Sequence, residues 1–236
     1  MPESLSVLTL IVCFCAIFVM ARFFGKAGLF VYSAIAAVAA NIQVLKLTKY
    51  FWIDEPVALG TVLFSTIFVV DNILTEYYGA KSAQKCVWLS FLCYLFFSLI
   101  MKIAIFHPVI CHSECINLHQ ELKNIFSPCF SLFISSTASY IIGQYTDISI
   151  FSALKKLTKG KYVSGRSFVS MAISSFVDNC IFSLLAWVIL AENPVSLLSL
   201  WKTYIIITYT IRLIIVVSCV PLVRLFGIVI PRKFHV

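Results

Sequence analysis

Charged residues are scarce in this 236-residue sequence. Asp, Glu, Lys and Arg together make up 12% of it, about half the share of an ordinary soluble domain. Apolar residues make up 61%, and the mean hydropathy is +1.00. A soluble fold of this length could not bury so much apolar surface. The composition therefore excludes an ordinary globular protein and favours a membrane protein.

Glycine and proline are also few, and common catalytic motifs do not occur in the sequence. Eight Gly and seven Pro are too few for a low-complexity or disordered chain. Neither His-Glu-x-x-His nor Gly-x-Ser-x-Gly occurs, so no hydrolytic enzyme is indicated, and without a phosphate-binding loop the chain has no ATPase motif of its own. We expect a protein that is not an enzyme and needs no cofactor. The alternative is a membrane-embedded enzyme with Asp71, Glu76 and Asp178 as acid–base groups.

Long apolar runs, by contrast, are frequent. Seven runs have roughly the 17–25 residues that cross a bilayer core, near residues 5–21, 29–47, 57–75, 86–106, 128–151, 167–191 and 200–225. They predict an all-α, polytopic membrane protein with one transmembrane domain over residues 1–236. The first run has no basic residue before it and no small-residue cleavage site after it, so we expect a retained helix and not a signal peptide.

The basic residues predict the orientation of the chain. One set of loops holds most of the 18 Lys and Arg residues: Arg22, Lys26, Lys81, Lys85, Lys155, Lys156, Lys159, Lys161, Arg166, Arg224, Arg232 and Lys233. The alternate loops hold Lys46, Lys49, Lys102, Lys123 and Lys202. The positive-inside rule then places the N-terminus outside and the C-terminus in the cytoplasm. We expect the run from Lys155 to Lys161 to contact anionic lipid headgroups and not nucleic acid.

Several polar residues lie inside the apolar runs, where an ionisable side chain is costly and needs a reason. Asp178 and Arg212 are near the middles of the sixth and seventh runs. The two side chains either form a buried pair that only holds the bundle together or face a polar cavity and a ligand.

The fifth run carries a polar stripe at helical spacing, formed by Thr137, Tyr140, Gln144 and Asp147. This face either binds a ligand or bonds to neighbouring helices. Polar groups also occur in two earlier runs: Asp71 lies within the third, Glu76 at its predicted cytoplasmic end, and Asn41 within the second. Together the side chains predict a cavity rich in hydrogen-bond donors and acceptors.

These motifs resemble the bacterial queuosine precursor transporter family. The resemblance covers residues 20–225 and rests on Phe24–Lys26, Ala39–Lys46, Asp71–Gly79, Ala138–Asp147 and Ser175–Asn179 in the same order. It implies a multi-pass protein of the bacterial inner membrane with six or seven helices, which imports 7-deazaguanine bases such as queuine or its aminomethyl and nitrile precursors. It also implies that the polar positions Asn41, Asp71, Glu76, Gln144, Asp147, Asp178 and Arg212 bind the substrate, to which the stripe adds Tyr140.

The chemistry of such a base suits these side chains. A deazaguanine presents two N–H donors on one edge, which one carboxylate can accept, and a carbonyl oxygen that an amide or a guanidinium can bind. We expect Asp178 to take the N–H edge, with Asp147 as the alternative, and Gln144 and Asn41 to bind the remaining polar groups. Arg212 would orient or neutralise the carboxylates, and Tyr or Phe would stack on the ring.

Three questions stay open at this point. The chain is either a lone carrier, which the resemblance favours, or the substrate-binding subunit of an ATP-driven vitamin-type importer. Transport is either facilitated diffusion, which we favour, or coupled to protons or sodium, with Asp71, Asp147 and Asp178 as candidate proton sites. Finally, His107, Cys111, Cys115 and His119 recur every four residues; a zinc site or a disulfide of Cys111 is an alternative there, but we expect neither.

Overall fold

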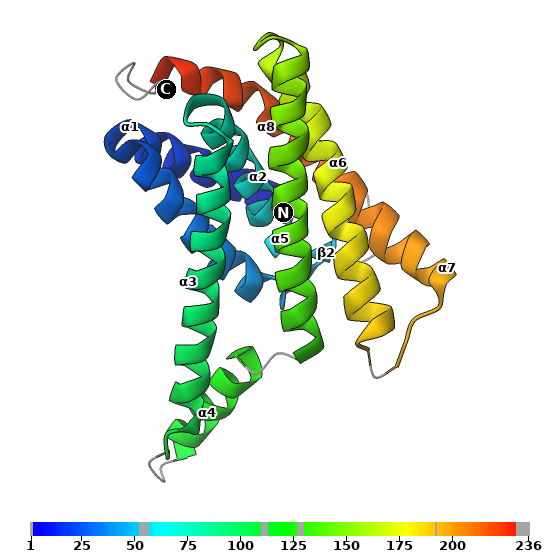
Figure 1. Cartoon of the computed structure of the whole chain (residues 1–236). Coiled ribbons are helices and arrows are strands. Elements are labelled where there is room, and N and C mark those ends of the chain that lie inside the picture. Colours follow the sequence, from blue (N-terminus) through cyan, green and yellow to red (C-terminus); the bar gives the residue numbers. More distant parts are fainter. Residues whose placement is uncertain (1, 52–56, 110–112, 127–129, 192, 230–236) are drawn as a thin grey trace.

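The structure is a computed structural model that describes residues 2–51, 57–109, 113–126, 130–191 and 193–229, and helices dominate it (Figure 1). The elements in chain order are α1 (Pro2–Gln43), β1 (Leu47–Thr48), β2 (Val57–Ala58), α2 (Gly60–Tyr77), α3 (Ala80–Phe106), α4 (Ser113–Phe126), α5 (Phe130–Leu157), α6 (Val163–Leu184), the π-helical turn Leu185–Ile189, α7 (Leu197–Ser199), the π-helical stretch Leu200–Ile206 and α8 (Ile207–Val229).

The first two predicted spans lie within α1, which bends sharply between them. Gly25 at the bend has φ 56° and ψ −133°, a conformation that residues with a Cβ rarely adopt. Gly28 permits the close contact after the bend, because a Cβ there would lie 2.3 Å from the carbonyl oxygen of Met20. The helix ends at Gln43, earlier than predicted, because the chain then forms the short antiparallel pair β1–β2.

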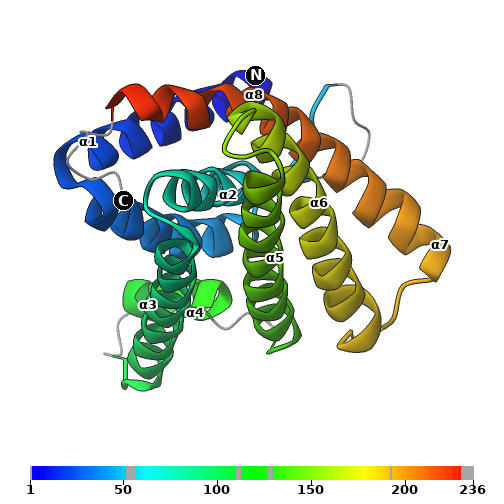
Figure 2. The same ribbon diagram turned by 45° about the horizontal axis from the view of Figure 1, so that its top comes forward.

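Helix α2 is the centre of the bundle. Every residue from Gly60 to Thr75 except Phe64 is buried, and α2 packs against α1, α3, α5 and α8. Figures 1 and 2 both show α2 enclosed by these helices. Polar residues of α2 therefore face protein and not lipid, which explains how the helix carries Asp71 and Asn72 in its interior.

Four helical stretches of the described chain are long and apolar enough to cross a membrane: Glu3–Gln43, Ala80–Phe106, Val163–Ile189 and Leu197–Gly227. The first has 41 residues, about 60 Å of helix, and this is twice the thickness of a bilayer core. Because it bends at Gly25, it is long enough for the two crossings that the sequence predicts. The prediction of an all-α, polytopic membrane protein is confirmed.

The two ends of the bundle differ in charge. Figure 1 places the α2–α3 turn, the α5–α6 turn and the end of α8 together, far from α4 and the α6–α7 connection. The first end, which we call the basic end, carries Lys81, Lys85, Lys155, Lys156, Lys159 and Lys161. The loops that the sequence groups by charge therefore meet in space, and their cytoplasmic location stays a prediction.

Helix α4 lies in the connection that the sequence analysis examined for a metal site. His107 ends α3, whereas Cys115 and His119 belong to α4, so His107 does not share a helical face with the other two. Cys111 lies outside the described residues. Within the described part of the chain, no three His, Cys, Asp or Glu side chains are grouped as metal ligands would be.

Candidate functional site

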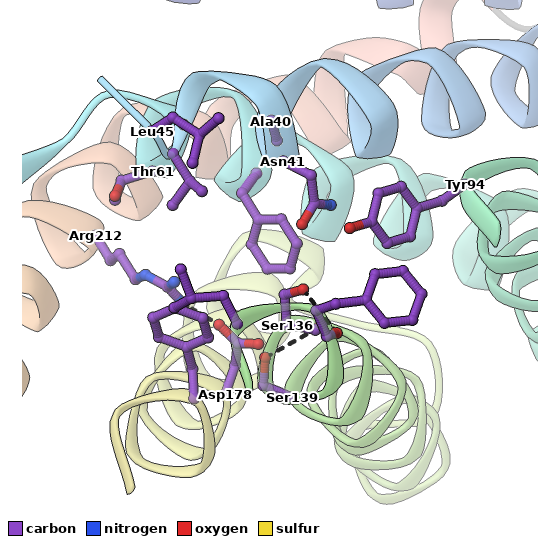
Figure 3. A pocket seen from close by; sticks show the side chains of 15 residues that line it. Ala40, Asn41, Leu45, Thr61, Tyr94, Ser136, Ser139, Asp178 and Arg212 are labelled. Carbon is purple, nitrogen blue, oxygen red and sulfur yellow. Dashed lines mark hydrogen bonds and ion pairs between the residues drawn. The ribbon is translucent and has the colours of Figure 1, made fainter. Parts of the chain in front are cut away.

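A cavity of about 90 Å³ lies between α1, α2, α3, α5, α6 and α8 (Figure 3). Its polar lining comes from Asn41, Thr61, Tyr94, Ser136, Ser139, Asp178 and Arg212, and its aromatic lining from Phe64, Phe133 and Phe182. Three of the predicted site residues, Asn41, Asp178 and Arg212, thus converge on one cavity from three different helices.

Asp178 and Arg212 form a buried ion pair at the edge of this cavity. The Asp178 side chain accepts a hydrogen bond from Arg212 through Oδ2, and the two residues are 1% and 8% exposed. Asp178 Oδ1 has no hydrogen-bond partner among the described residues. Arg212 thus gives the carboxylate a counter-charge and uses one of its oxygens, and the other oxygen is left for a ligand.

A glycine on α5 allows this arrangement. A Cβ at Gly143 would lie 2.9 Å from the Cβ of Asp178, so α5 approaches α6 closely only because residue 143 has no side chain. On its other side, the Arg212 guanidinium lies over the ring of Phe64, 5.6 Å from the ring centroid. Packing on both sides therefore fixes the direction in which the carboxylate points.

Asn41 and Tyr94 face Asp178 from across the cavity (Figure 3). Asn41 Nδ2 donates to the carbonyl oxygen of Ala37 at 2.8 Å, which orients the amide group toward the cavity. The Tyr94 ring stacks on Phe133, with 5.6 Å between centroids and 26° between planes. The cavity thus places a carboxylate opposite an amide, a phenol and flat apolar rings.

Four other predicted residues lie away from the lining of this cavity. Tyr140, Gln144 and Asp147 on α5 are buried, as is Asp71 on α2. Asp71 is ten residues beyond Thr61, which is about 15 Å along the helix. We call these four residues the inner cluster. The sequence predicted one polar site, but the structure separates the inner cluster from the cavity that holds Asp178.

The last predicted residue, Glu76, lies near the basic end and is paired twice. Its Oε2 is 3.0 Å from Arg166 and 3.3 Å from Lys155, so α2, α5 and α6 are tied together there. The sequence predicts a loop position for Arg166, but this residue lies within α6, is 2% exposed and contacts the ring of Phe151. Arg166 is thus a second buried arginine, and Glu76 closes the bundle instead of lining the cavity.

Several lining residues escaped the sequence analysis. Phe64, Tyr94, Ser136 and Phe182 are unremarkable in a chain with 15% aromatic residues. The sequence offers little indication of Tyr94, Ser136 and Phe182, because these residues can be identified as cavity residues only when the inward-facing side of each helix is known. Thr61 and Phe64 lie about three and two turns before Asp71 on the same helix, and this spacing was the one usable indication.

Comparison with known proteins gives consistent results. Residues 58–226 match the model of a family described as "Putative vitamin uptake transporter". A Bacillus subtilis protein named "Probable queuosine precursor transporter" is 31% identical over 200 residues, which cover 84% of this chain and 82% of that protein. A Haemophilus influenzae protein of the same name is 27% identical over 128 residues, which cover 54% of this chain and 51% of that protein.

No solved structure matches the chain. The family match covers most of the sequence, and the first relative is similar over more than four fifths of its length. Both agree with the apolar helices of the bundle. The chain is therefore a multi-pass bacterial membrane transporter of small molecules and belongs to the vitamin uptake transporter family.

Proposed function

We propose that this transporter imports queuosine precursors, the 7-deazaguanine bases, into the cytoplasm, and that the cavity beside Asp178 binds them. The observation that carries the proposal is the carboxylate of Asp178, which Arg212 holds in a buried cavity and whose Oδ1 has no partner among the described residues. The names of the two relatives support the class of substrate.

The hydrogen-bonding capacity of Asp178 suits the guanine-like edge of such a base. A carboxylate has about four acceptor positions, and the described residues use Oδ2 for Arg212 and leave Oδ1 free. The ring N–H and the exocyclic amine of a deazaguanine are adjacent donors, so they bind the two oxygens side by side. A pyrimidine or a purine without the amine would lose one of these bonds.

The aromatic residues suit the flat ring. Phe64, Phe133 and Phe182 line the cavity together with Tyr94, and offset or edge contacts with a ring are worth about 0.5–1.5 kcal/mol beyond burial. Asn41 lies across from Asp178 and offers both an N–H and a carbonyl oxygen, so it suits the far edge of the base. This position leaves Asn41 and Tyr94 to discriminate among ring substituents.

The sequence also allowed a substrate-binding subunit that depends on a separate ATPase. We infer a lone carrier, because the inner cluster extends a polar route from the cavity into the bundle, up to the ion pairs of Glu76 that close it in this structure. A subunit that only binds substrate does not need such a route.

The test is uptake of a labelled 7-deazaguanine base into proteoliposomes that contain only the purified chain. We expect saturable uptake by the wild-type protein and no uptake by the Asp178→Asn variant. Binding of the base without uptake would identify a binding subunit. Neither binding nor uptake by correctly inserted wild-type protein would refute the proposed substrate.

A further inference from the structure

The acidic residues inside the bundle differ in whether a cationic side chain neutralises them. Asp178 is paired with Arg212, and Glu76 is paired with Arg166 and Lys155. No such cation contacts the other two acids of the core, Asp71 and Asp147, among the residues that the structure describes.

These two acids are also poorly hydrogen-bonded. Asp71 is 1% exposed, and neither of its carboxylate oxygens has a partner in the described part of the chain. Asp147 is fully buried; its Oδ1 accepts a hydrogen bond from Ser174 Oγ at 3.2 Å, while Oδ2 has no partner among the residues described. Gln144 is fully buried as well, and no described residue bonds to either polar atom of its amide. The inner cluster therefore contains more free acceptors than donors.

The four residues form one cluster because of helical spacing and packing. Tyr140, Gln144 and Asp147 are four and three residues apart, so they share one face of α5. This face is buried, whereas Ile142 on another face is 46% exposed. Helix α2 packs against α5, and Asp71 lies close enough to Asp147 and Tyr140 for an electrostatic interaction with each. Asp71 thus faces the buried stripe of α5.

Two ionised carboxylates cannot share this environment without a counter-charge. A buried, unpaired carboxylate costs several kcal/mol even after relaxation, and a second one nearby adds repulsion. We propose that Asp71 and Asp147 form the binding site of a proton that is transported together with the base. This inference rests on the proposed transport function and replaces the facilitated diffusion that the sequence alone favoured.

A small second cavity links this site to the substrate cavity. It has a volume of about 10 Å³, and its polar lining comes from Asn41, Ser90, Tyr94, Ser136, Thr137 and Tyr140. Asn41, Tyr94 and Ser136 also line the larger cavity, and Tyr140 belongs to the inner cluster. The hydroxyl groups of Tyr140 and Ser90 have no partner among the described residues. A space of this size has room for about one water molecule, and the hydroxyl groups of Tyr140 and Ser90 would be its hydrogen-bond partners on a path from the cavity to the cluster.

Beyond the inner cluster the path is closed. Glu76 lies five residues after Asp71, about 8 Å along α2, where Arg166 and Lys155 bind it. In the described part of the chain, the buried titratable or charged groups on the helices packed against α2 are Cys13 and Tyr32 of α1, Cys86 of α3, Tyr140 and Asp147 of α5, Arg166 and Asp178 of α6, and Arg212 and Cys219 of α8. Tyr32 is hydrogen-bonded to Thr66 and Arg212 is paired with Asp178. The proton site is therefore reached from the cavity and separated from the basic end.

The test uses wild-type protein in proteoliposomes whose exterior is one pH unit more acidic than the interior. A proton carried with each neutral base supports accumulation of up to about tenfold, which a protonophore abolishes, and addition of the base makes the medium more alkaline. Uptake that stops at equal concentrations, or that a sodium gradient drives at constant pH, overturns the proton site and leaves the transport function standing. Absence of any uptake refutes the transport function itself.

Variants locate the site. Asp71→Asn and Asp147→Asn should each abolish accumulation and the alkaline shift, whereas Glu121→Gln on the exposed surface of α4 should behave like the wild type. A further measurement does not depend on the activity of the variants. Purified wild-type protein at neutral pH should show the infrared absorption of a protonated carboxylic acid, which either substitution removes. Full ionisation of every carboxyl group in the wild type overturns the proposal.

Discussion

Neutralising one or both members of the Asp178–Arg212 pair separates a structural role from a functional one. Arg212→Met leaves Asp178 buried without a counter-charge, because the residue is 1% exposed and its other carboxylate oxygen has no partner in the part of the chain that the structure describes. Breaking a buried pair in this way costs about 3–5 kcal/mol of unfolding free energy. For a chain of this size, that lowers the melting temperature by roughly 6–20 °C.

Replacing both residues removes the penalty. Buried pairs replaced by apolar side chains of similar size are often as stable as the original, so Asp178→Leu with Arg212→Met should recover the melting temperature almost fully. Uptake should not recover, because the base loses two charge-assisted hydrogen bonds of about 1.5–3 kcal/mol each. That loss lowers affinity at least about 100-fold.

The assay combines thermal unfolding in detergent, followed by tryptophan fluorescence, with uptake of the labelled base in proteoliposomes. Stability that returns in the double variant without uptake supports a substrate site. A double variant with both wild-type stability and wild-type uptake would show that the pair only holds the helices together, and the reasoning would fail.

Three further substitutions test the surroundings of the site. Gly143→Ala should reduce uptake at least about tenfold, because the added Cβ displaces the carboxylate of Asp178 in the cavity. The control Gly165→Ala, whose Cβ meets nothing within 4 Å, should leave uptake unchanged. Arg166→Met should lower the unfolding free energy by about 1.5–3 kcal/mol, measured by thermal unfolding, because Glu76 loses the buried one of its two cations and keeps Lys155; a change below about 0.5 kcal/mol would contradict this. Phe64→Leu should raise the Kd of the base about 2–10-fold through lost ring contacts, whereas Phe96→Leu on the lipid-exposed surface should leave it unchanged.

The sequence predicted the class of fold and the pair of charges in the core for the same physical reason. Lipid does not hydrate polar groups, so apolar runs and isolated ionisable residues within them are both informative. Asp178 and Arg212 stood out on this ground, and the structure brings them together. Tyr140, Gln144 and Asp147 were recognised as one helical stripe, and the structure buries all three.

Other features depend on packing, which the sequence does not specify. Arg166 follows a run of lysines and resembles a loop residue. Only the fold shows that it forms an ion pair with Glu76 inside the bundle. The sequence also did not distinguish the substrate cavity from the inner cluster, because the depth of Asp71 along α2 and the close approach at Gly143 are three-dimensional facts. The sequence did not identify the aromatic residues that line the cavity for a similar reason, since most aromatic residues here face lipid or other helices.

The charge balance changed most between sequence and structure. Counting residues within the apolar runs placed four acids against one arginine, whereas the structure adds Arg166 and assigns each arginine to one acid. The remaining negative charge is thereby confined to Asp71 and Asp147. That assignment is what moves the expected mechanism from facilitated diffusion to proton coupling.

Competition for uptake tests the central claim most directly. Proteoliposomes that contain only the purified chain would take up a labelled 7-deazaguanine base in the presence of excess queuine, its aminomethyl and nitrile precursors, guanine or adenine. The account predicts strong competition by the deazaguanines, which share the N–H edge that Asp178 accepts, and none by adenine, which lacks it. Uptake that adenine inhibits as well as queuine does, or that none of the deazaguanines inhibits, would contradict the account.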